Sequence, residues 1–132
     1  MDERRIFPLY SSILPFLLPP TPPPLNMLIR IVRMTFRPGA VDTFLEHFDR
    51  VAPSIRAFGG CEHLELWQDL HAPTRCTTYS LWRSEQALEA YRESELFRST
   101  WSVVKPLFAA PPHAFSSRRL RGGGKVASTT PS

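Results

Sequence analysis

The order of apolar repeats along the chain is the feature that most constrains its fold. Between residues 28 and 120, segments with apolar side chains at every second position alternate with segments in which they recur every three or four residues. The first pattern is typical of β-strands and the second of helices. Their order is strand, helix, strand, strand, helix, strand. We therefore predict an α+β, ferredoxin-like βαββαβ fold, with a four-stranded antiparallel sheet and helices on one face.

The first half of this pattern contains one strand and one helix. The segment 28–36 is rich in β-branched and apolar residues, which predicts a strand. The segment 40–58 has apolar residues on one helical face. Pro53 lacks the N–H that a helix interior requires, so we expect a kink or a restart there. Gly59 and Gly60 then end the helix.

Two further strands are predicted at 61–69 and 76–82, joined by a hairpin connection. Cys61 and Cys76 are the only cysteines in the chain. Each begins one of these antiparallel strands, so the two thiols lie at opposite ends of the hairpin, too far apart for a disulfide. We expect both to be reduced, which is typical of a cytoplasmic protein.

The second helical region is interrupted. Ser84 is a suitable N-cap for a helix over 85–93. The apolar spacing is lost at Ser94, which we expect to cap a second helix ending near Pro106. The segment 113–120 completes the pattern as a last strand.

The ends of the chain differ in composition from its middle. Residues 1–26 contain seven of the 14 prolines, so we predict a disordered, Pro-rich extension there. An atypical export or membrane-surface signal is the alternative, although prolines interrupt its apolar run. We assign 27–120 to one domain and 121–132 to a flexible tail.

The charge distribution gives little support for a nucleic-acid partner. The whole chain carries a formal charge of +4, but residues 27–115 contain ten Lys and Arg against ten Asp and Glu. The domain is therefore neutral and the surplus lies in the tail. We predict neither a nucleic-acid nor a membrane partner.

A sheet with helices on one face leaves its other face open. Here both faces of the first strand are partly apolar. A domain of this size buries only about 60% of its unfolded surface by itself. We therefore predict a homodimer formed through the open face.

Aromatic residues are concentrated in the second half of the domain. Such residues are most often core, but three Trp and two Tyr exceed what a core of this size needs. We predict an aromatic pocket between the sheet and the second helical region. Its predicted substrate-binding residues are Trp67, Tyr79, Trp82, Tyr91, Phe97 and Trp101.

The residues that commonly bind metals are scattered, and we predict no metal site. We place His47 on the polar face of the first helix and His71 in a loop, with His113 at the edge of the last strand. Side chains at alternate strand positions are several ångströms apart and do not close on one ion. This applies to the set of Cys61, His63 and Glu65.

Three motifs together resemble a known family. They are "IRIVRMTFRPG", the turn "FGGC", and "YSLWRSEQALEAYRESELF". On these motifs the stretch from Met27 to about Leu120 resembles the antibiotic biosynthesis monooxygenase domain, a dimeric α+β barrel. The resemblance implies oxygenation of polycyclic aromatic or quinol substrates without a metal, flavin or other cofactor. Some members of the family degrade haem, and many have no assigned reaction.

The haem-degrading branch is disfavoured by this sequence. Its members carry an Asn, a Trp and an iron-binding His at positions that correspond to Val32, Tyr91 and Trp101. An indole offers only an N–H donor, so Trp101 cannot bind iron.

We therefore predict a cofactor-independent monooxygenase of small aromatic or quinol-type substrates. The alternative is a non-catalytic barrel that binds or senses a small ligand. His63 is the candidate base, because imidazole exchanges protons near neutral pH, and Arg33 is the candidate group for stabilising an oxyanion. Each also has an ordinary structural interpretation, His63 at an interface and Arg33 in an ion pair with Glu62 or Glu65.

Overall fold

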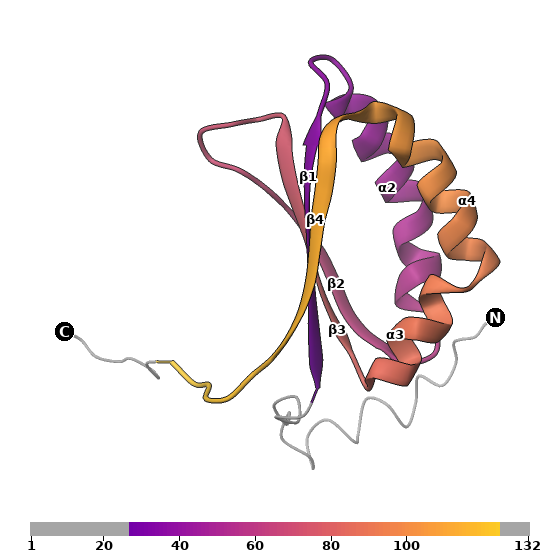
Figure 1. The fold of residues 1–132 in the computed structure, drawn as a ribbon, viewed down its shortest axis with the longest axis vertical. Helices are drawn as coiled ribbons and strands as arrows, with labels where there is room; N and C mark the ends of the chain where they lie inside the picture. The colour runs from indigo at the N-terminus through magenta and orange to yellow at the C-terminus, as the bar shows by residue number, and fades with distance from the viewer. Residues whose placement is uncertain (1–26, 125–132) are drawn as a thin grey trace, which may run out of the picture.

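The computed structural model describes residues 27–124, and the predicted extension at 1–26 and residues 125–132 lie outside that range. The predicted βαββαβ order is confirmed, with the second helical region divided in two. Figure 1 shows the helices on one face of a twisted sheet, whose other face carries no layer of helices. The elements are β1 Leu28–Phe36, α2 Val41–Arg56, β2 Cys61–Gln68, β3 Arg75–Trp82, α3 Glu85–Arg92, α4 Glu95–Val104, a 3₁₀ turn Lys105–Leu107 and β4 Phe108–Arg118.

The sheet has the strand order β2-β3-β1-β4, and every neighbouring pair is antiparallel. Because side chains alternate along a strand, the register assigns each residue to one of two faces. Met34 and Phe36 are buried against α2 and α4, which identifies their parity as the helix side. Ile31 has the opposite parity and lies between Tyr79 of β3 and Phe115 of β4 on the open face.

Of the two outcomes expected at Pro53, a kink or a restart, the restart does not occur. It runs as one element to Arg56, with Pro53 in its last turn. The backbone N–H of Ala57 still donates to the Pro53 carbonyl, at 3.0 Å. Since Pro53 is exposed, the Asp49 carbonyl that loses its donor lies on the side where water can replace it.

The predicted caps of the second helical region are both present. The side chain of Ser84 accepts a hydrogen bond from the backbone of Ala87, and that of Ser94 accepts one from Phe97, each at 3.1 Å. Each serine satisfies a backbone donor that its helix leaves unpaired. Ser94 therefore begins a new helix, α4, at the point where the apolar spacing of α3 fails.

The last strand begins earlier than predicted. β4 starts at Phe108 and passes through Pro111 and Pro112, which we had placed before the strand. Arg33 pairs with His113 and Thr35 with Ala110, so the two prolines together oppose a single residue of β1. This is a β-bulge on an edge strand, the place where a sheet tolerates residues without an N–H.

The core consists of two clusters between sheet and helices. One contains Met34, Phe36, Phe44, Cys76 and Val104. The other contains Ala52, Ile55, Leu64, Trp82, Leu88 and Tyr91. Members of both clusters line the candidate site.

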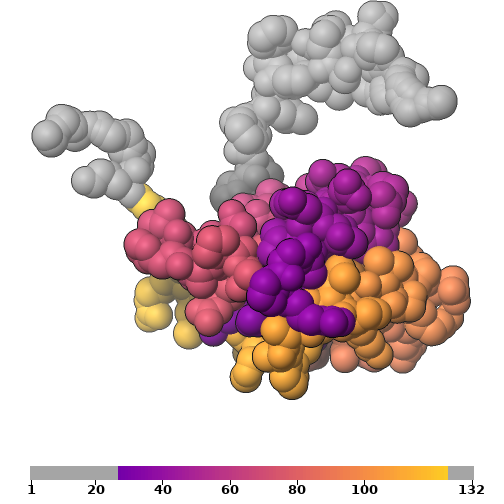
Figure 2. All heavy atoms as spheres, turned by 90° about the horizontal axis from the view of Figure 1, so that it is seen from above, coloured from indigo at the N-terminus to yellow at the C-terminus, as the bar shows by residue number. Residues whose placement is uncertain are grey.

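The first cluster lies at the end where two connections meet. The backbone N–H of Arg37, after β1, donates to the Leu107 carbonyl, before β4, at 2.9 Å. Figure 2 shows the β1–α2 turn and the start of β4 side by side at this end.

Among the described helices, none combines the length and the apolar character needed to cross a membrane.

The cysteines are placed as predicted. Cys61 is opposite Trp82 and Cys76 is opposite Gln68, so the thiols lie at the two ends of the hairpin. Both are free.

Candidate functional site

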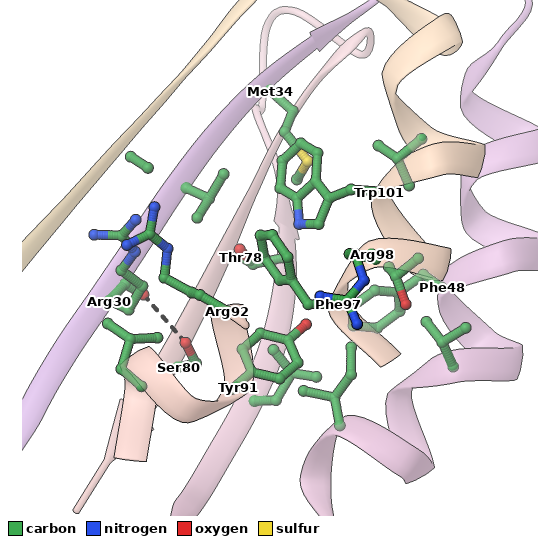
Figure 3. Close-up of a pocket in the computed structure, with 18 of the residues that line it drawn as sticks. Arg30, Met34, Phe48, Thr78, Ser80, Tyr91, Arg92, Phe97, Arg98 and Trp101 are labelled. Carbon is green, nitrogen blue, oxygen red and sulfur yellow. Dashed lines mark hydrogen bonds between the residues drawn. The ribbon is translucent and has the colours of Figure 1, made fainter. Parts of the chain in front are cut away.

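A cavity of about 850 Å³ lies between the helix side of the sheet and the helices α2, α3 and α4. Its size falls within the range of about 300 to 1,000 Å³ that is usual for small-molecule sites. Figure 3 shows aromatic rings projecting into it from the helices. Four of the six residues predicted to bind substrate line it: Trp82, Tyr91, Phe97 and Trp101.

These four rings form a continuous series along the cavity. Trp82 and Tyr91 are stacked with centroids 5.0 Å apart, and Tyr91 meets Phe97 edge-on at 5.2 Å. Phe97 is 5.7 Å from Trp101. Trp82 comes from β3, Tyr91 from α3 and the other two from α4, so only the fold brings the set together. The result is a wall that suits a flat aromatic molecule.

Tyr91 is the one residue of these four whose side chain titrates, and its pKa is shifted. Burial, with a smaller effect of the neighbouring Cys61 thiol, raises the pKa of Tyr91 to about 12. The phenol therefore stays protonated at neutral pH. It can donate a hydrogen bond to a ligand but cannot act as an anion.

Two polar side chains on the sheet side of the cavity, those of Trp82 and Ser80, are already paired. The indole N–H of Trp82 donates to Ser80 Oγ at 3.0 Å. The Ser80 hydroxyl in turn points to the Arg30 carbonyl at 3.5 Å (Figure 3). These contacts fix the orientation of the Trp82 ring without requiring a ligand.

Positive charge gathers at one margin of the cavity. Arg30 of β1 and Arg92 of α3 both line it, and Figure 3 shows their guanidinium groups close together. Burial, and next the charge of Arg92, lower the pKa of Arg30. Arg30 Nη1 donates to Ser116 Oγ at 3.0 Å, and Arg92 forms an exposed ion pair with Glu89 at 3.2 Å. Two adjacent cations favour an anionic group at this margin.

The remaining predicted residues lie on the other face of the sheet. Trp67 and Tyr79 are stacked there with centroids 5.3 Å apart. Glu65 accepts from Trp67 Nε1 at 2.9 Å and lies 2.6 Å from His63 Nε2. The hydrogen bonds from Trp67 and from His63 lower the pKa of Glu65. None of these residues lines the cavity.

Arg33 also lies on the open face. Its guanidinium is 5.4 Å from the centre of the Phe115 ring. The ion pair expected as its structural alternative is not formed among residues 27–124, because Glu62 pairs with Arg83 and Glu65 with His63. The catalytic roles predicted for His63 and Arg33 remain predictions, and they apply to this face rather than to the cavity.

His47 and Thr100 line the cavity and were missed by the sequence analysis. We had placed His47 on the polar face of its helix, which is wrong, since it is only 7% exposed. The spacing contained the signal, because His47 lies three residues after Phe44 and four before Val51, on the border of the apolar stripe. Thr100 likewise lies four residues before Val104. Both helices are packed closely enough for these border positions to be buried.

No group of three or more His, Cys, Asp or Glu side chains within residues 27–124 is arranged to hold a metal ion. In the strand set considered above, Cys61 Sγ contacts the His63 carbonyl, and His63 contacts Glu65. The three residues thus contact one another along the strand.

Comparison with known proteins agrees with this architecture. The family model described as antibiotic biosynthesis monooxygenase matches residues 27–101. A search of curated proteins finds no match.

Solved structures share the fold at low sequence identity. A Nitrosomonas europaea protein named "Putative antibiotic biosynthesis monooxygenase" has a TM-score of 0.70 at 17% identity, covering 79% of this chain and 100% of its own. PA3566 from Pseudomonas aeruginosa has a TM-score of 0.66 at 24% identity, covering 73% and 96%. A conserved protein from Methanosarcina mazei Go1 has a TM-score of 0.69 at 16% identity, covering 72% and 94%.

Proposed function

The chain belongs to the antibiotic biosynthesis monooxygenase family, and from this premise we propose that it oxygenates small aromatic, quinol-type molecules without a cofactor. The observation that carries the proposal is the cavity of about 850 Å³ lined by Trp82, Tyr91, Phe97 and Trp101. We assign these four residues to substrate binding. Their stacked and edge-on rings match the faces and edges of a flat aromatic substrate.

The chemistry asks for an electron-rich phenol and dioxygen. The phenol loses its O–H proton, and the phenolate passes one electron to dioxygen. The resulting phenoxyl radical and superoxide combine at a ring carbon to give a peroxide anion, which takes up the proton released in the first step and becomes a hydroperoxide. Loss of water, with the ring C–H proton, then leaves a quinone carbonyl. One oxygen atom enters the product and the other becomes water, so that dioxygen is the oxidant and the phenol the reductant.

The cavity suits this sequence of steps. Its wall is largely apolar, which favours the neutral aromatic body and excludes water that would quench a radical intermediate. Arg30 and Arg92 at its margin favour the anionic form of the substrate. Tyr91, which remains protonated, is available as a hydrogen-bond donor.

Oxygen uptake tests the proposal. We expect the purified protein, treated with a chelator and freed of flavin, to consume dioxygen with a panel of quinols and hydroxylated polycyclic compounds and to release quinones. The uptake should equal the quinone formed. Tight binding of these compounds without uptake would contradict the oxygenase and favour a ligand-binding or sensing protein.

Blocking the cavity with a large side chain tests whether the reaction takes place there. Ala114 lies on β4 in the cavity wall, and Ala114→Phe should fill the margin and lower the rate by about 100-fold. Ala109 is exposed on the same strand and does not line the cavity, so Ala109→Phe should keep the wild-type rate. Equal rates in the two variants would place the reaction elsewhere.

We also propose that the protein works as a homodimer in the cytoplasm. The open sheet face supports the dimer, since Trp67 is 45% exposed and Phe115 39% exposed there. Large apolar side chains exposed on one face favour association with a second copy. The two unbonded cysteines agree with a reducing compartment.

A further inference from the structure

Two polar atoms of the cavity wall have no hydrogen-bond partner. His47 Nε2 of α2 and Thr100 Oγ1 of α4 are buried from solvent, and neither is bonded to any group within residues 27–124. The two residues are only 7% and 8% exposed. Buried polar atoms in native proteins are nearly always paired, so an unpaired one needs an explanation. Both residues line the same cavity, so a bound molecule that reaches the two atoms would supply the missing partner.

Among residues 27–124, the buried side-chain atoms that lack a partner belong to the helix side alone. On the sheet side, Trp82 donates to Ser80, and Ser80 points to the Arg30 carbonyl. Those groups satisfy one another before any ligand enters. The buried atoms that lack a partner therefore lie on α2 and α4, two helices that contact each other.

The surroundings of this place are apolar. Phe44, Phe48 and Val104 line the cavity from the same two helices. A strongly hydrated group or an isolated charge would lose its water there without full compensation. An aromatic molecule that carries one small polar group meets both demands, because its ring fills the apolar space.

When His47 carries its hydrogen on Nδ1, the two atoms together select the kind of polar group. A neutral imidazole nitrogen without a hydrogen accepts a hydrogen bond, and a threonine hydroxyl can donate one. A hydroxyl oxygen within reach of both atoms satisfies the two at once, since it donates its own hydrogen and accepts another. A carbonyl oxygen has no hydrogen to give to an accepting nitrogen, and an aromatic amine is a poor acceptor.

We propose that His47 and Thr100 form a subsite that binds the hydroxyl of an aromatic ligand, with His47 as its base. The aromatic nature of the ligand rests on the proposed function. In the proton transfer, the phenol O–H bond breaks and an N–H bond forms at His47 Nε2. The electron pair stays on the phenolate oxygen, which Thr100 stabilises by donating its hydroxyl hydrogen. His47 becomes an imidazolium, and its charge is balanced by the phenolate.

A pair of probes that differ only in the hydroxyl tests the subsite. We expect the wild-type protein to bind 2-naphthol about tenfold or more tightly than naphthalene, as measured by equilibrium dialysis. Thr100→Val and His47→Leu keep the approximate size of the side chain and remove the polar atom. Each should reduce the preference for naphthol severalfold while leaving the affinity for naphthalene within about twofold.

The chain offers matched controls for both substitutions. His71 is exposed in the β2–β3 connection, and Thr43 is exposed on α2. His71→Leu and Thr43→Val should keep the full preference for naphthol.

Stability without ligand gives a second readout. Because the Thr100 hydroxyl is unpaired in the free protein, Thr100→Val should raise the melting temperature while it weakens naphthol binding. A purely structural threonine would show the reverse, with a lower melting temperature and an unchanged preference. This readout also covers the case in which His47→Leu folds poorly.

Three results would overturn the subsite. They are an equal affinity of the wild type for the two probes, a full preference retained in both variants, and failure of the wild type to bind either probe. The second result would mean that the two atoms bind water rather than the ligand. Loss of the preference in the variants without any oxygen uptake by the wild type would refute the oxygenase and leave the subsite standing.

Discussion

Tyr91 serves both the core and the cavity. It is 8% exposed and belongs to the core cluster that contains Trp82, on which it stacks. The same residue lines the cavity. Its burial, with a smaller effect of Cys61, raises its pKa to about 12.

This shift predicts how stability changes in alkali. The unfolded chain releases the Tyr91 proton near its ordinary pKa of 10.0, whereas the folded chain holds it until about 12. The folded state then binds more protons, so stability is full below pH 10 and falls as the pH rises through about 12. Tyr91→Phe should remove this loss of stability, which reaches about 2 to 3 kcal/mol at the top of the pH range.

The measurement is the free energy of unfolding in urea at several values between pH 9 and 12. Burial also raises the pKa of Cys61 and Cys76, but both thiols are present in both proteins, so their effects cancel in the comparison. Tyr79→Phe, on the open face, is the matched control. Parallel pH curves for wild type and Tyr91→Phe would contradict the raised pKa of Tyr91.

At the scale of elements, the turn from α2 into β2 controls how closely α3 approaches the sheet. Gly60 has a φ of +93°, a conformation that residues with a Cβ rarely adopt. A Cβ at this position would also overlap the Cβ of Ala87 in α3. Two separate constraints thus require glycine at this turn.

Gly60→Ala should lower the free energy of unfolding by about 2 to 4 kcal/mol, since it adds backbone strain and a steric overlap. Two other glycines separate these causes. Gly39 has a φ of +84° with open space around it, so Gly39→Ala should cost only the strain, about 1 to 2 kcal/mol. Gly59 has neither constraint, and Gly59→Ala should stay within about 0.5 kcal/mol. Equal losses for Gly60→Ala and Gly39→Ala in urea unfolding would exclude a role of the contact with α3.

At the scale of the whole molecule, the two faces of the sheet have different tasks. The helix side encloses the cavity, and the open side presents the aromatic and apolar residues that we assign to the dimer. β4 is exposed along nearly its whole length, so the edge of the sheet also lies open in the single chain.

Ile31 provides the test of the dimer, because it lies between Tyr79 and Phe115 in the middle of the open face. Ile31→Glu would place an unpaired charge in the interface and should weaken association by at least about 100-fold. Light scattering after size-exclusion chromatography should then give a monomer mass. Val103→Glu adds the same charge at an exposed apolar position of α4 and should leave the dimer intact. A dimer that survives Ile31→Glu would have to form through another surface.

The sequence by itself determined the order of elements and most of their ends. Strand and helix periodicities act over neighbouring residues, and the caps at Ser84 and Ser94 depend only on residues three positions away. The family resemblance followed from the same stretches. The start of β4 could not be predicted, because prolines are tolerated there only through a bulge against β1.

The tertiary structure alone decided which candidate residues meet. The aromatic set was predicted as one group, but strand parity divides it, with Trp82 in the cavity and Trp67 and Tyr79 on the open face. His47 and Thr100 come from different helices, so no local pattern joins them. Their burial depends on the packing of α2 against α4, and that packing is a property of the folded chain. Local periodicity can assign a residue to a face of its own element, but only the pairing of elements determines what that face meets.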